Sequence, residues 1–166
     1  MFAGLVAKKK GSLFAGASFG LTSGVITTLG ILVGVGTITN SEEAVLAGII
    51  SVAIADSLSD ATGMHLAKEA EGEYRSGELW AITVATLFAK FFFTIIFVLP
   101  ILLFDLMGAM ITGIALGFVL LSLLSFIIAR IHKQKPFKPV LEHNLTALLV
   151  IILTYLVGYL VHRFVS

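Results

Sequence analysis

The sequence predicts an all-α polytopic membrane protein with five transmembrane helices in a single domain, residues 1–166. The mean hydropathy is +1.05, and 58% of the residues are hydrophobic whereas 13% are charged, about half the charged share of a soluble domain. Apolar stretches also recur at lengths near the ~20 residues that cross a bilayer. Strands are not expected, because a single apolar segment satisfies its backbone in lipid only as a helix.

The apolar stretches and the basic residues together predict a topology. The five expected spans are 13–38, 43–68, 79–104, 107–130 and 144–164. Lysines and arginines gather before the first span and in the second and fourth connections, which share one side of the membrane. The positive-inside rule therefore predicts a cytoplasmic N-terminus and a C-terminus on the far side. We expect an integral protein of a prokaryotic cytoplasmic membrane, or of a vacuolar membrane in a eukaryote.

Cysteine content, the order of residues at the N-terminus and the number of basic residues exclude several classes of protein. The chain has no cysteine, which excludes a disulfide framework and thiolate metal ligands. The lysines near the N-terminus follow a short apolar start, an order unlike that of a cleavable signal peptide, so the first span is expected to be retained. Basic residues are few and lack interleaved aromatics, which argues against nucleic-acid binding.

The first span carries a stripe of small residues. Gly16, Gly20 and Gly24 recur every four residues, a spacing that lets another helix approach closely. The stripe is expected either at a homodimer interface or in packing within one subunit. Ser23 and Thr27 add hydroxyls to this helix, and Ser23 lies ~18 Å along it from Gly11, near the membrane midplane.

The second span carries the residues that point most directly to chemistry. Asp56, Asp60 and Met64 lie four residues apart, so they stack on one helix face. Carboxylates inside an apolar helix are costly and usually face a polar pathway or a partner. Carboxylate oxygens suit Mn²⁺ and Fe²⁺, and a thioether adds affinity for softer ions. We therefore predict a cation-binding face with Ser59 beside it. The alternative is that the two aspartates only bond neighbouring hydroxyls or are held protonated.

The end of this helix and the third span supply further candidates. His65, Glu69 and Glu71 are expected where ions would enter from the cytoplasm, although a lone histidine at a helix end is more often interfacial. Lys90 lies ~15 Å from Trp80 along the third span. We expect it to pair with Asp56 when the site is empty and to be displaced by an arriving cation. A fixed ion pair that only orients the helices is the alternative.

The end of the third span, the fourth span and the loop after it give fewer indications of function. The fourth span has no ionisable residue before Arg130, and the basic loop RIHKQKPFK after it is typical of a segment that faces lipid headgroups. Pro100, near the end of the third span, is expected to kink its helix.

Several stretches together resemble the vacuolar iron transporter family. They are GLTSGVITTLGILVGV in the first span, VLAGIISVAIADSLSDATGMHLAKE in the second, FVLPILLF at the end of the third and LTYLVGYLV in the last. The resemblance covers nearly the whole chain and keeps the five-helix order. The cytoplasmic metal-binding domain that usually follows the second helix is absent, so the chain resembles a short member of the family.

The resemblance implies a homodimer that exports ferrous or manganous ions from the cytoplasm, usually in exchange for protons, along a path between the first two helices of both subunits. The family's first-helix aspartate falls on Ser23. Its second-helix methionine falls on Asp60, and the following glutamate falls near Met64. These exchanges relocate carboxylates, which leaves the metal preference open.

From these observations we expect a secondary transporter of divalent cations and no enzyme activity or resident cofactor. An alternative is a membrane-embedded, metal-dependent enzyme resembling phosphatidyl-alcohol transferases, because Asp56, Asp60 and Gly63 match part of their aspartate motif. The rest of that motif is absent, and product formation from a nucleotide-activated lipid would distinguish the two. A second alternative is a structural membrane subunit, in which both aspartates would tolerate alanine.

Overall fold

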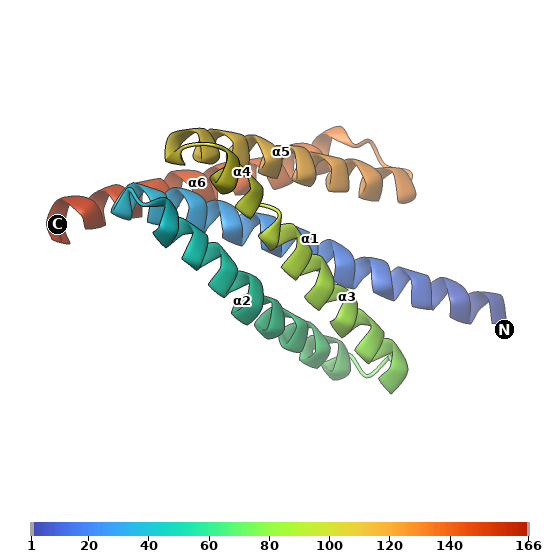
Figure 1. The fold of residues 1–166 in the computed structure, drawn as a ribbon. Helices are drawn as coiled ribbons and strands as arrows, with labels where there is room; N and C mark the ends of the chain where they lie inside the picture. The colour runs from blue at the N-terminus through green and yellow to red at the C-terminus, as the bar shows by residue number, and fades with distance from the viewer. Residues whose placement is uncertain (1, 166) are drawn as a thin grey trace. The chain divides into compact units, whose positions relative to one another are not determined.

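The computed structural model describes the backbone of residues 2–165 and the side chains of residues 11–164. Within that part of the chain every regular element is a helix, which confirms the all-α prediction (Figure 1). The helices are α1 (Phe2–Thr39), α2 (Glu42–Ala70), α3 (Ser76–Ile95), α4 (Val98–Leu103), α5 (Leu106–Ile131) and α6 (Phe137–Val165).

Among the residues that the structure describes, five segments are long and apolar enough to cross a membrane, as the hydropathy predicts. They are Gly11–Thr39, Glu42–Ala70, Ser76–Leu103, Leu106–Ile131 and Phe137–Phe164. Large apolar side chains lie on the outside of these helices, among them Phe88 at 66% and Leu103 at 71% exposure. So much exposed apolar surface is unusual for a soluble monomer and suits contact with lipid.

Two helices begin well before the expected residue. α6 starts at Phe137 and not at 144, because a proline in the first turn, here Pro139, interrupts no helical hydrogen bond. α1 starts at Phe2 and not at 13, because lysine is a good helix former and the helix continues through Lys8–Lys10. Hydropathy marks where lipid contact begins, and these helices extend past that point.

The third span consists of two helices where the sequence predicts one kinked helix. α3 ends at Ile95 and α4 begins at Val98, two residues before Pro100. Proline has no N–H to donate, and its ring clashes with the carbonyl four residues earlier, which is that of Ile96. The backbone turns instead, and the Leu99 N–H donates to the Ile96 carbonyl at 3.2 Å.

Local capping explains the other boundaries. Asn40 ends α1 in the left-handed region at φ 47°, which asparagine tolerates better than most residues. The Ser41 hydroxyl accepts from the Ala44 N–H at 3.1 Å at the start of α2, and the Asp105 carboxylate accepts from the Gly108 N–H at 3.2 Å at the start of α5.

The chain divides into two compact units that share the long helices α1 and α2. One unit contains Met1–Gly24 and Ser51–Ile95, and the other contains Val25–Ile50 and Ile96–Ser166. In the second unit α5 packs against α6. Polar bonds join these two helices, since the Asn144 amide donates to the Ser122 hydroxyl and His143 Nδ1 lies 2.7 Å from the Ser125 hydroxyl.

Candidate cation site in the first unit

The site is built on a close approach of α1 to α3. An added Cβ would lie 2.6 Å from the Ile82 carbonyl oxygen at Gly16, and 2.5 Å from that of Thr86 at Gly20. At Gly24 it would lie 3.0 Å from the carbonyl oxygen of Lys90. The glycine stripe is therefore covered by a helix of its own chain. Its expected place at a homodimer interface is wrong for these three residues, and the alternative of internal packing is correct.

The face of α3 that meets this glycine stripe is polar. Thr86, Lys90 and Thr94 recur every four residues and are all fully buried. The opposite face of the same helix exposes Phe88 and Phe92. A helix with a polar interior face and an apolar exterior face is typical of membrane proteins that enclose a polar site.

Lys90 lies at the centre of the site. Its Nζ atom is 2.5 Å from Asp56 Oδ2 and 2.5 Å from Asp60 Oδ2, and it donates to Ser23 Oγ at 2.9 Å. The Ser23 hydroxyl donates in turn to Asp60 Oδ2 at 2.5 Å. The expected ion pair with Asp56 is confirmed, and Asp60 and Ser23 join it. Three helices thus contribute to one cluster, which we call the Lys90 cluster: Ser23, Asp56, Asp60 and Lys90.

Two members of the Lys90 cluster, Asp56 and Lys90, lie at the middle of their spans. Asp56 has fourteen residues of Glu42–Ala70 on either side, about 21 Å of helix in each direction. Lys90 has fourteen residues before it and thirteen after it in Ser76–Leu103. Water reaches the end of a membrane helix far more easily than its middle, so these charges must find partners within the protein.

The cluster carries a formal charge of −1, from two carboxylates and one ammonium. The Lys90 side chain is 0% exposed, whereas those of Asp56 and Asp60 are 33% and 21% exposed. The ammonium is therefore enclosed by protein, and the carboxylates have an open side. An ion that approaches from outside this unit meets the carboxylates first.

The other residues expected on the pathway lie outside the hydrogen bonds of the cluster. Ser59 is exposed, and Met64 is half-buried one turn beyond Asp60 on α2. Thr27 belongs to the second unit, where it lines an apolar groove with Gly30 and Leu153. Ser59 and Met64 were expected at the site because they are close to the aspartates in sequence, and Thr27 because it adds a hydroxyl to the first span. Neither observation fixes the direction of a side chain.

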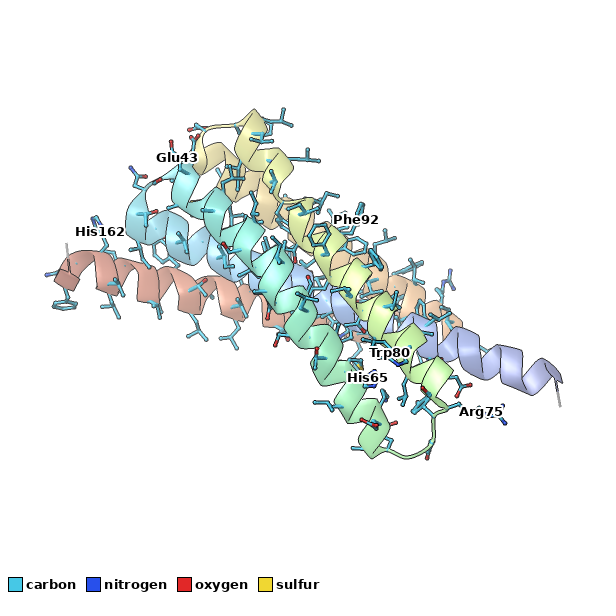
Figure 2. The ribbon with its side chains drawn as sticks, turned by 60° about the horizontal axis from the view of Figure 1, so that its bottom comes forward. Glu43, His65, Arg75, Trp80, Phe92 and His162 are labelled. Atoms are coloured by element: carbon cyan, nitrogen blue, oxygen red, sulfur yellow. The ribbon has the colours of Figure 1, made fainter. Side chains whose placement is uncertain are left out.

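The end of α2 beyond Met64 contacts α3 through His65. His65 Nδ1 lies 2.7 Å from the Thr83 hydroxyl, which already donates its proton to the Leu79 carbonyl, so the histidine nitrogen is the donor. The rings of His65 and Trp80 lie side by side with centroids 4.9 Å apart (Figure 2). His65 thus has a structural contact that the sequence did not predict.

The two glutamates expected at the cytoplasmic end differ in their surroundings. Glu71 pairs with Lys68 at 2.6 Å, and Glu69 is exposed. Glu69 lies in the last turn of α2 and Glu71 just past its end. Their expected role in receiving ions from the cytoplasm stays a prediction.

The sequence interpretation missed three buried hydroxyls. Thr86 donates to the Ile82 carbonyl at 2.9 Å, whereas Thr94 and Ser57 are buried without a hydrogen-bond partner. The spacing of Thr86, Lys90 and Thr94 at intervals of four residues was the available signal, because residues four apart share one helix face. Two unpartnered hydroxyls thus lie within one helical turn of a cluster residue, one along α2 and one along α3.

Within residues 11–164 no group of three or more histidine, aspartate or glutamate side chains is placed to hold a metal. The cluster instead offers two carboxylates and a hydroxyl, which are oxygen ligands suited to hard or borderline cations. Comparisons with models of protein families, with curated proteins and with solved structures found no match.

Proposed function

We propose that this protein is a secondary transporter that moves divalent cations of the Fe²⁺/Mn²⁺ class out of the cytoplasm in exchange for protons. The observation that carries the proposal is the ammonium of Lys90, a buried cation held at mid-span by Asp56, Asp60 and Ser23. A membrane helix bundle retains such costly charges most often where an ion or proton must pass.

The ligand chemistry supports a divalent ion as the cargo. Asp56 and Asp60 together carry a charge of −2, which matches the charge of a divalent cation, so only the charge of the Lys90 ammonium would remain unbalanced. The resemblance to vacuolar iron transporters favours the same ions, and Met64 is available one turn along α2. The same carboxylates can carry protons on the return step, which is the basis of the proposed exchange.

We propose that the protein works as a homodimer that covers the open side of the cluster. Side chains of Asp56 and Asp60 are 33% and 21% exposed at the depth where lipid tails would surround them, and contact of a carboxylate with lipid is costly. A second copy facing this side of α2 would remove that contact and supply two more carboxylates. The interface would lie at α2, since α3 already covers the glycine stripe of α1.

Metal flux in proteoliposomes tests the proposed function. We expect the wild-type chain to move Mn²⁺ and the double variant Asp56→Asn with Asp60→Asn to lose at least nine-tenths of that flux, because amides do not replace two anionic ligands. Glu142→Gln is the matched control, since this exposed glutamate pairs only loosely with Lys138, at 3.7 Å. Equal flux in the double variant and the control would reject the proposal and favour a structural subunit.

The proposed orientation is tested with single cysteines, for which the natural absence of cysteine provides a clean background. We expect a cysteine placed at Gly72, between α2 and α3, to react with a membrane-impermeant maleimide only after the membrane is opened. A cysteine at Asn40, between α1 and α2, is expected to react in intact cells. The reverse pattern would invert the proposed direction of transport.

A further inference from the structure

We infer that Lys90 is a resident competitor for the cation site: its ammonium occupies the oxygen atoms that a transported ion needs, and an ion binds only when the ammonium has withdrawn. This inference rests on the proposed function and specifies how the same site is regulated.

The geometry makes the two cations mutually exclusive. The ammonium of Lys90 donates to Oδ2 of Asp60 and to Oγ of Ser23, and it forms an ion pair with Oδ2 of Asp56. The three oxygen atoms lie 2.5–2.9 Å from Nζ. A divalent ion ligated by the same atoms would lie almost on top of the ammonium, and like charges at such a distance in a low dielectric repel strongly.

The chain also provides a way for the ammonium to withdraw while the backbone stays in place. The backbone at Lys90 is fixed against α1, where a Cβ on Gly24 would lie 3.0 Å from its carbonyl oxygen. The flexible four-carbon stem of lysine lets the ammonium move independently of this contact.

One turn along the same buried face, Thr94 presents a hydroxyl that has no hydrogen-bond partner. Residues four apart on a helix are neighbours, so this hydroxyl is within reach of a displaced ammonium. Because the carboxylates are open on the side away from the enclosed lysine, an arriving ion would drive the ammonium toward the interior of the unit.

Equilibrium binding of Mn²⁺ to the full chain in lipid nanodiscs, followed by electron paramagnetic resonance, tests this inference. Lys90→Met keeps the length of the stem and removes the competing charge, so we expect at least tenfold tighter binding than in the wild type. Lys90→Arg supplies a larger cation with five donors that can hold both carboxylates, so we expect binding at least tenfold weaker. The expected order of affinity is methionine, then lysine, then arginine.

A merely structural lysine predicts a different order. If Lys90 only positions the aspartates, the wild type binds most tightly and both variants bind more weakly, and this result would overturn the inference while leaving the proposed function intact. Lys90→Gln, which retains two N–H donors without charge, gives the same comparison should the methionine variant fail to fold, and tighter binding is again expected.

A different result of the same binding measurement would contradict the proposed function itself. The triple variant Asp56→Asn, Asp60→Asn, Lys90→Met lacks every charge of the cluster and is expected to bind no Mn²⁺. Wild-type binding equal to that of the triple variant would show that the cluster is not a metal site, whatever the order of the Lys90 variants.

Discussion

Replacing Asp56 and Asp60 together by asparagine is expected to lower the free energy of unfolding by about 3–5 kcal/mol, the usual effect of leaving a buried charge without its partner. Lys90 is 0% exposed and has both carboxylates within 2.5 Å. In the double variant its ammonium would remain enclosed with only neutral acceptors around it. Unfolding in mixed detergent micelles, followed by circular dichroism, gives the measurement.

Adding Lys90→Met to the double variant is expected to recover most of this loss, because neutral side chains then fill a site without a net charge. Glu142→Gln serves again as the control for loss of a carboxylate at an exposed position. A triple variant as unstable as the double variant would mean that the lost hydrogen bonds, and not the unpaired charge, cause the destabilisation. The stability of the triple variant also validates its use as the reference that does not bind metal.

Gly20→Ala is expected to destabilise the protein by about 1–3 kcal/mol or more, as overpacking of a tight contact does. The new Cβ would lie 2.5 Å from the carbonyl oxygen of Thr86 and 2.9 Å from the backbone nitrogen of Lys90. Backbone atoms cannot rotate aside, so α1 and α3 would have to separate. The same change should reduce metal binding, because a shift of α1 would move the Ser23 hydroxyl away from the carboxylate of Asp60.

Gly63→Ala in α2 provides the matched control. Nothing lies within 4 Å of the Cβ that this substitution adds, and alanine is a better helix former than glycine by about 1 kcal/mol. We expect the thermal midpoint of Gly63→Ala to rise and that of Gly20→Ala to fall. Equal shifts in the two variants would show that the contact of α1 with α3 is looser than the structure indicates.

The sequence predicted the spans well because lipid contact requires long apolar runs, which hydropathy measures directly. It also predicted the pair of Lys90 and Asp56, since two opposite charges near the middle of their spans have strong reason to meet. It did not predict that Asp60 and Ser23 join them, because this depends on how each helix is rotated about its axis. Small-residue spacing has the same limitation: it predicts a close contact at Gly16, Gly20 and Gly24 without naming the partner helix.

Helix boundaries show a second limit of the sequence interpretation. Pro100 predicts a disturbance in the third span, but whether the helix bends or breaks depends on how its freed backbone groups are satisfied. The early start of α6 at Phe137 was missed because polarity, and not helix propensity, set the expected boundary. Thr94 was missed for another reason: a single threonine changes the hydropathy of an apolar run little, although Lys90 lies one turn before it.

The pairing between α2 and α3 has a consequence for biogenesis. A lysine or an aspartate at the centre of a helix costs ~2.5–3.5 kcal/mol when that helix leaves the insertion machinery alone. Only residues 71–75 separate α2 from α3, so the nascent chain can present both as a hairpin in which Lys90 already meets Asp56 and Asp60. Each helix would then neutralise the charge of the other while both enter the bilayer.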